Sequence, residues 1–178
     1  LFSGTAHEFI DAKLREREAR HIKQGGQRYM VEPNVKEGKG GLRDLHSLFW
    51  IAKYVHRVKT TSDLLELSLF SQEEHKVFAS AERFLWAVRS HLHLITDRAS
   101  DQLTFDLQVQ VAEVMGYNEQ GSRPAVEMFM QDYFGHATKI GDLTRIFLTF
   151  LEASHAKSEP LLQKILRRKP VVKADYII

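Results

Sequence analysis

The feature that most constrains the fold is the helical spacing of apolar residues over most of the chain. From Leu42 to Leu151 apolar side chains recur every three or four residues, the spacing of amphipathic helices that each bury one face. Short polar segments separate the stretches with this period, which cover residues 42–58, 71–97, 104–115 and 122–151. The sequence therefore predicts a mainly α fold, a bundle of about five helices joined by short loops.

Several residues mark the expected ends of these helices. Ser71 and Glu74 have the spacing of a capping box at the start of the second stretch, and Thr104 is a suitable N-cap for the third. Gly116 stands where a helix-ending glycine is favoured. These signals predict that the helices of the bundle begin and end close to the limits of the apolar pattern.

The first 41 residues have a different organisation. Thr5 and Glu8 form another capping-box pattern, and Gly25-Gly26 would end the helix that follows it. Residues 28–32 are rich in strand-favouring side chains, and Pro33 stops the run. A glycine-rich loop then leads into the bundle, so we expect a helix, a short strand and a loop before Leu42.

Composition excludes several classes of protein. The 178 residues contain no cysteine, which excludes disulfides, a thiol nucleophile and cysteine-based metal sites and fits a cytoplasmic protein. No apolar run approaches the ~20 residues needed to cross a bilayer, so no membrane association is expected. With 25 basic and 23 acidic residues, overall charge gives no reason to expect binding to DNA or RNA.

The charges are nevertheless unevenly distributed along the chain. Residues 1–43 carry nine basic and six acidic side chains, residues 44–159 eleven and sixteen, and residues 160–178 five and one. Two basic ends thus flank an acidic middle. Since the chain also begins at Leu1 and ends in apolar residues, we expect it to be an internal piece of a longer protein.

Common catalytic motifs are missing from the sequence. GxxxxGK[ST], GxSxG, HExxH, His-Asp and Asp-x-Asp do not occur. His91 and His93 are two residues apart, so on a helix they point in different directions and do not share a metal ion. The sequence therefore carries none of the usual markers of P-loop proteins, hydrolases or metalloproteases.

Unusual chemistry concentrates between Glu32 and Asp44. A carboxylate at the end of the expected strand is followed by a glycine loop and the start of a helix. Backbone N–H groups, a helix dipole and nearby cations would suit a polyphosphate, and Glu32 could hold a divalent ion. The expected phosphate-binding residues are Lys36, Lys39, Gly40, Gly41 and Arg43. The alternative is a structural turn with solvated charges.

The residues of this region carry a resemblance to a known family. YMVEPNVKEGKGGLRDLH at residues 29–46, followed by FWIA at 49–52, resembles the signature of the bacterial PII uridylyltransferase/uridylyl-removing enzyme family. LTFDLQ at 103–108 and MQDYF at 130–134 are similar to the same family. The likeness covers nearly the whole chain.

The resemblance implies a place in a larger enzyme. That family has a nucleotidyltransferase domain, a helical segment, an HD phosphohydrolase domain and two ACT domains. By this likeness residues 1–41 are the end of the transferase domain, residues 42–160 the helical bundle and residues 161–178 a basic exit linker. The implied activity is Mg²⁺-dependent transfer of UMP from UTP to a tyrosine of PII, and hydrolytic removal of that UMP. The fragment alone is expected to be inactive.

The resemblance also implies a catalytic role for one acid. Transferases of this kind add a third carboxylate from a later strand, and Glu32 is where it would fall, as catalytic residue and metal ligand. Glu32 could instead brace the loop. The first two acids of such transferases follow a Gly-Ser turn as Asp-x-Asp. Gly121-Ser122 is followed by Asp132, but we interpret this as a coincidence because no second acid follows Asp132.

Two other readings remain open at this point. The chain could be a noncatalytic interaction or linker module whose acidic bundle docks neighbouring domains or PII. It could also belong with the related adenylyltransferase of glutamine synthetase, although that enzyme's corresponding strand and loop differ from residues 32–36.

Overall fold

The computed structural model describes residues 3–158 of the chain. Within that range the chain is mainly helical, as predicted, and forms no strand. The predicted linker at 161–178 lies outside the described residues. The helices are α1 (Ser3–Lys23), α2 (Leu42–His56), α3 (Asp63–Glu66), α4 (Gln72–Thr96), α5 (Phe105–Val114) and α6 (Ala125–Ser158).

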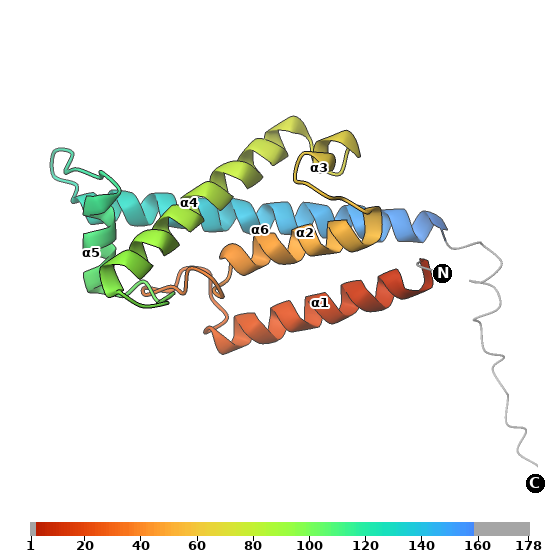
Figure 1. Cartoon of the computed structure of the whole chain (residues 1–178), viewed down its shortest axis with the longest axis horizontal. Coiled ribbons are helices and arrows are strands. Elements are labelled where there is room, and N and C mark those ends of the chain that lie inside the picture. The colour runs from red at the N-terminus through yellow and green to blue at the C-terminus, as the bar shows by residue number, and fades with distance from the viewer. Residues whose placement is uncertain (1–2, 159–178) are drawn as a thin grey trace, which may run out of the picture.

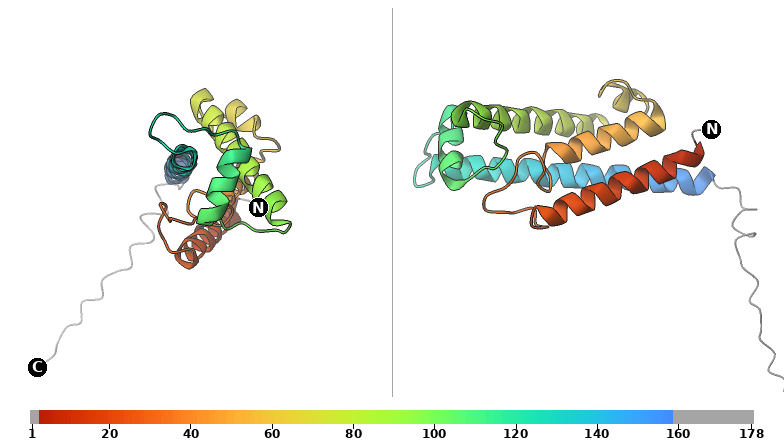
Figure 2. Two further views of the ribbon diagram at one scale, coloured as in Figure 1. Left: turned by 90° about the vertical axis from the view of Figure 1, so that its left-hand side faces the viewer. Right: turned by 60° about the horizontal axis from the view of Figure 1, so that its bottom comes forward.

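Helix α6 is the central helix of the bundle. Figure 1 shows α6 running along the length of the molecule, with α4 crossing it and α5 lying across one end. Helices α2, α4 and α5 all pack against α6, while α1 packs on α2. The two further views in Figure 2 show the same arrangement from the end and from below. The glycine loop between α1 and α2 lies beside the first half of α6, where Gly40 meets the backbone of Ala137.

The core is built from the apolar stripes that the sequence showed. Phe78 of α4 and Phe129 and Phe147 of α6 are fully buried, and each such side chain contributes about 1.5–3 kcal/mol of hydrophobic stabilisation. The ring of Phe70 meets the rings of Phe78 and Phe147 at centroid distances of 6.1 and 6.0 Å. The expected bundle of helices after Leu42 is confirmed.

The predicted helix starts are confirmed to different degrees. At α4 both arms of the capping box are present: Glu74 N–H donates to Ser71 Oγ at 3.2 Å, and Ser71 N–H donates to Glu74 Oε2 at 2.7 Å. Helix α1 begins at Ser3, so Thr5 lies inside its first turn, where its hydroxyl is 2.8 Å from that of Tyr54. The Thr5 capping box is therefore wrong as the start of α1.

The glycine pair after α1 ends that helix as predicted. Gly25 and Gly26 have φ values of +88° and +71°, in the region that glycine occupies most readily. Gly26 N–H donates to His21 O at 2.8 Å and Gly25 N–H to Ile22 O at 3.1 Å, which is the Schellman pattern. The chain therefore turns back sharply toward α6.

The strand predicted at residues 28–32 is wrong. The segment is irregular, and Tyr29 and Val31 are 61% and 62% exposed. A strand needs a partner for its backbone groups, and the described residues supply side chains instead. Gln108 Nε2 donates to Val31 O at 2.8 Å, and Gln102 Nε2 donates to Glu32 O. Strand propensity alone did not decide the structure.

Among the described residues no helix is both long enough and apolar enough to cross a membrane.

Candidate functional site

The glycine-rich loop folds around the side chain of Asn34. The N–H groups of Lys36 and Glu37 donate to Asn34 Oδ1 at 3.1 and 2.7 Å. Gly38 N–H donates to the backbone oxygen of Asn34 at 2.9 Å. An asparagine that bonds the backbone just beyond itself favours a tight turn, so the loop has a defined shape before α2 begins.

Both of the predicted phosphate-binding glycines are packing positions. Gly40 has φ +81°, and a Cβ there would overlap the backbone of Ala137 in α6. A Cβ on Gly41 would lie 2.7 Å from the backbone oxygen of Val35, closer than side-chain carbons approach an oxygen. Glycine is therefore required at both positions so that the loop can lie against α6 and against itself.

Several backbone donors of this loop already have partners. Gly40 N–H donates to Asp44 Oδ2 at 2.9 Å, Gly41 N–H to Gly38 O at 2.9 Å, and Arg43 N–H to Lys36 O at 2.9 Å. A phosphate at these groups would have to replace existing hydrogen bonds. Phosphate binding by Gly40, Gly41 and the start of α2 stays a prediction.

Asp44 is the centre of a buried charge cluster that joins α1 to α2. Its side chain has no solvent exposure and pairs with Arg17 at 3.3 Å and with Arg20. His21 Nε2 lies 3.0 Å from both carboxylate oxygens. Including the bond from Gly40, the carboxylate is fully surrounded by donors, as a buried charge requires.

The surroundings of Asp44 lower its pKa below the ordinary value of 3.8. Burial acts in the opposite direction and is the largest single influence, but the His21 hydrogen bond, the Arg17 charge and the Gly40 N–H together outweigh it. Sequence reasoning missed this cluster. The available signal was the i, i+3, i+4 spacing of Arg17, Arg20 and His21, which places them on one face of α1.

Lys36 and Arg43 lie on another side of the loop, among carboxylates. Arg43 Nη2 is 3.1 Å from Glu37 Oε1, and Lys36 Nζ is 3.8 Å from Glu37 and 3.9 Å from Asp101. Asp101 also accepts a hydrogen bond from Arg89 of α4 at 2.7 Å. Lys36 therefore ties the loop to α4 through Asp101, Arg43 ties it to α2, and both cations are already paired.

Glu32 caps helix α5. Phe105 N–H, at the start of α5, donates to Glu32 Oε1 at 2.9 Å. Thr104 occupies the predicted N-cap position, but its side chain makes no capping bond. The carboxylate thus supplies the acceptor that a helix start needs, and its charge favours the positive end of the helix dipole.

The described residues do not by themselves form a magnesium site. No group of three His, Asp or Glu side chains in that part of the chain is placed to hold a metal ion. Mg²⁺ takes six oxygen ligands, of which a protein usually supplies one or two carboxylates. Glu32 can offer one, so any complete site would need groups from beyond the described residues.

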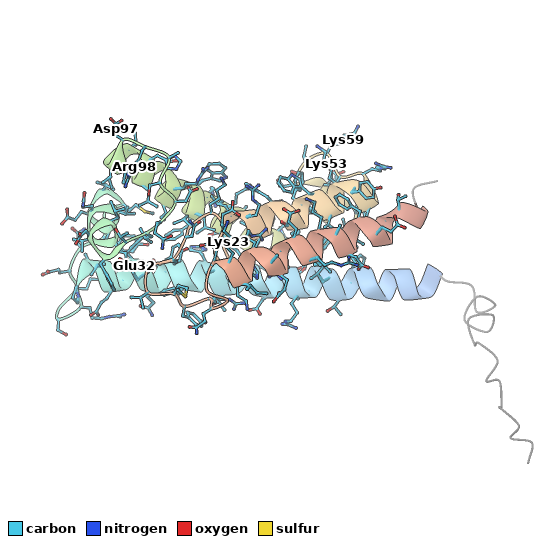
Figure 3. All side chains as sticks on the ribbon, turned by 90° about the horizontal axis from the view of Figure 1, so that it is seen from below. Lys23, Glu32, Lys53, Lys59, Asp97 and Arg98 are labelled. Atoms are coloured by element: carbon cyan, nitrogen blue, oxygen red, sulfur yellow. The ribbon has the colours of Figure 1, made fainter. Side chains whose placement is uncertain are left out.

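The structure brings together Glu32 and Lys39 but separates them from the other predicted residues. Both line a pocket of about 300 Å³, together with Lys23 and Arg28. Lys36, Gly40, Gly41 and Arg43 do not line it. Figure 3 shows Lys23 at the C-terminal end of α1 and Glu32 beyond it, toward α5.

This loop and bundle match a family model over most of the chain. Residues 8–148 match the family described as GlnD PII-uridylyltransferase. The chain belongs to this uridylyltransferase family. It is 62% identical over 99% of its length to the bifunctional uridylyltransferase/uridylyl-removing enzyme of Ruegeria pomeroyi. The enzymes of the same name from Cereibacter sphaeroides and Phenylobacterium zucineum are 60% and 52% identical over 99% and 90% of the chain.

The uridylyltransferase relatives are much longer than this chain. It spans 19% of the Ruegeria pomeroyi and Cereibacter sphaeroides enzymes and 17% of the Phenylobacterium zucineum enzyme. No solved structure matches the chain.

Proposed function

We propose that this chain is a segment of a bifunctional enzyme that transfers UMP from UTP to a tyrosine of the PII protein and hydrolyses it off again. The observation that carries the proposal is the 62% identity over 99% of the chain to an enzyme named for both activities. The family model favours this reading over the adenylyltransferase of glutamine synthetase. As part of the proposal we place the enzyme in the cytoplasm.

The segment's own role in this proposal is support rather than chemistry. Its ion pairs, centred on the buried Asp44 and the half-buried Asp101, fix the loop to α1, α2 and α4. Within the described residues the acids do not cluster in the way that phosphoryl transfer on a metal requires. A rigid platform of this kind can hold a neighbouring active site in place.

We extend the proposal to Glu32 as an acid of the transferase site. Its Oε1 accepts the Phe105 N–H, and the other oxygen points to no hydrogen-bond donor that the structure describes. Glu32 also lies in the pocket with three cations. The expected Mg²⁺ would neutralise phosphate charge in the whole enzyme, with at most one ligand from this chain.

Two substitutions of Glu32 in the whole enzyme separate a metal-binding role from capping. Glu32→Gln keeps an oxygen for the Phe105 N–H but removes the charge, whereas Glu32→Ala removes both. If Glu32 serves the transferase, both variants lose UMP transfer to PII by about a hundredfold or more, and Glu32→Gln, which keeps the cap of α5, retains UMP removal. Glu113→Gln, on the exposed side of α5, is the matched control.

A capping role alone gives a different pattern. Glu32→Gln then retains transfer, and Glu32→Ala lowers both activities together because the start of α5 is disturbed. That result would contradict the catalytic assignment of Glu32 and leave the family assignment intact.

A second candidate role, docking of PII by a noncatalytic module, is favoured by one surface. Tyr29, Val31, Phe105 and Val109 are all exposed apolar side chains, and Glu32 and Gln108 join the two segments that carry them. Titration of the 178-residue chain with PII tests this role. Saturable binding that Phe105→Ser weakens would support it, and no detectable binding would leave only the scaffold role.

A further inference from the structure

Both tryptophans of the chain lie on one exposed face of the bundle. Trp50 of α2 and Trp86 of α4 are 37% and 41% exposed. The ring of His46 lies near both indoles, at centroid distances of 6.0 and 6.2 Å, so the two indoles belong to a single surface. Helix α2 lies between α1 and α4 (Figure 1). This surface, which we call the tryptophan face, therefore covers α2 and the adjoining side of α4.

Cations hold the two indoles in place. Lys13 Nζ and Arg43 Cζ lie 5.5 and 5.7 Å from the ring centroid of Trp50. Arg89 Cζ lies 5.2 Å from the ring centroid of Trp86. A cation over an indole ring is attracted to it, and each of these cations is also paired with a carboxylate: Glu16, Glu37 and Asp101. The indoles are therefore pre-positioned, and less conformational entropy is lost when a partner covers them.

The tryptophan face carries an excess of positive charge. Lys53 follows Trp50 by three residues and Arg83 precedes Trp86 by three, so each cation neighbours an indole on its own helix. Both cations are exposed, and neither forms an ion pair with the described residues. Glu82 is a carboxylate on the same helix as Trp86, but burial raises its pKa above the ordinary 4.5, which disfavours its negative charge. Lys53 and Arg83 are thus left without a compensating acid.

His46 reports the electrostatic potential at this face. Burial lowers the pKa of His46 below the ordinary 6.5, and the charges of Arg43, Arg89 and Lys36 lower it further, with Glu37 acting in the opposite direction. The nearby cations therefore outweigh the nearby carboxylate at this position. A partner that carries negative charge complements such a surface.

We propose that the tryptophan face docks an acidic segment of another domain of the same enzyme. An apolar side chain of that segment covers the indoles, and its carboxylates pair with Lys53 and Arg83. Tryptophan and arginine are the side chains that most often dominate the binding energy of protein interfaces. The chain spans only 19% of the Ruegeria pomeroyi relative, so most of such an enzyme is available to supply the segment. The inference rests on the proposed function only in treating the chain as a segment of that longer enzyme.

Cross-linking of the whole enzyme with a carbodiimide, in the absence of PII, identifies the partner. The reagent joins a lysine amine to a carboxylate that contacts it, and peptide mass spectrometry locates the new amide bond. We expect Lys53 to be joined to an aspartate or glutamate outside the 178 residues of this chain. Mixing isotope-labelled with unlabelled enzyme shows whether both residues belong to one polypeptide. A cross-link from Lys53 to a second copy, or one that forms only when PII is added, would overturn the proposal.

Oxidation of the indoles by hydroxyl radicals gives an independent measurement. In the 178-residue chain both tryptophans should be oxidised as exposed side chains. In the whole enzyme we expect Trp50 and Trp86 to be oxidised about fivefold more slowly or less, because the centre of an interface excludes water. Equal rates in the chain and in the whole enzyme would overturn the docking role.

Charge reversal in the whole enzyme tests the acidic chemistry of the partner. Lys53→Glu combined with Arg83→Glu places like charges opposite the expected carboxylates, so both tryptophans should be oxidised as fast as in the chain. The matched control combines Lys139→Glu with Arg123→Glu, at exposed positions on α6 and just before it, and should leave the indoles protected. Protection that survives the first pair of changes, or that is lost equally with both pairs, would overturn the proposal. Neither UMP transfer nor UMP removal is measured, so these results leave the proposed function to its own tests.

Discussion

Replacing Asp44 with asparagine removes the carboxylate that Arg17, Arg20 and His21 share. The shape of the side chain is kept, so packing changes little. The two guanidinium groups remain charged at any accessible pH, and the side chains of Arg17 and Arg20 are only 18% and 10% exposed. The variant therefore leaves two largely buried charges without their main partner.

The magnitude of this loss follows from the surroundings of the two arginines. Removing one partner from a buried ion pair destabilises a protein by about 3–5 kcal/mol. Arg20 retains Glu37 at 3.7 Å, so we place the loss of unfolding free energy near the lower limit, at about 3 kcal/mol. For a chain of this size, about 3 kcal/mol lowers the midpoint of thermal unfolding by about 6–12 °C.

Urea and thermal unfolding followed by circular dichroism measure this loss. The control is Asp142→Asn, which breaks an exposed pair with Arg145 at 3.8 Å on α6 and should change stability by less than about 1 kcal/mol. If Asp44→Asn is no more damaging than Asp142→Asn, the buried cluster does not hold α1 on α2, and this reasoning is refuted.

Three further predictions concern stability. The pKa of Asp44 in the folded chain lies below the ordinary 3.8. The stability that the Asp44 carboxylate contributes is therefore complete above pH 3.8 and is lost as the pH falls below 3.8. The unfolding free energies of wild type and Asp44→Asn should converge in acid. Gly40→Ala strains the backbone and overlaps α6, so it should lower the unfolding free energy by about 2–4 kcal/mol in urea melts. Gly116→Ala has free space around it and should lower the unfolding free energy only by the backbone strain, about 1–2 kcal/mol. Ser71→Ala should lose about 1 kcal/mol with the α4 cap, and an unchanged urea midpoint would contradict the cap's contribution.

The helices could be predicted from sequence because their signals are local. The apolar period and the Ser71–Glu74 box depend on residues within a few positions of one another, and the structure places α4 at Gln72–Thr96, close to the predicted 71–97. Gly25 and Gly26 also end α1 as predicted, because the ease of adopting a positive φ is a property of glycine itself.

The strand and the α5 cap could not be predicted, because both depend on contacts between distant segments. Residues 28–32 have strand-forming side chains, but Gln102 and Gln108 bond their backbone instead of a second strand. Glu32 occupies the cap of α5 across more than 70 residues. No local pattern shows such a pairing.

The internal arrangement of the candidate site could not be predicted from the sequence. The sequence indicated that chemistry concentrates between Glu32 and Asp44. The structure then divides this stretch: Glu32 and Lys39 line a pocket, while Arg43 pairs with Glu37. The role of Asp44 required knowing that α1 packs on α2, which charge patterns alone do not determine.

The most direct test of the central claim is the transfer of labelled UMP from UTP to PII. The assay compares the whole enzyme with the 178-residue chain, each with PII and Mg²⁺. The account predicts that the whole enzyme labels PII and that the chain alone does not, because its described residues lack a cluster of catalytic acids. Labelling by the chain alone at a comparable rate, or none by the whole enzyme, would contradict it.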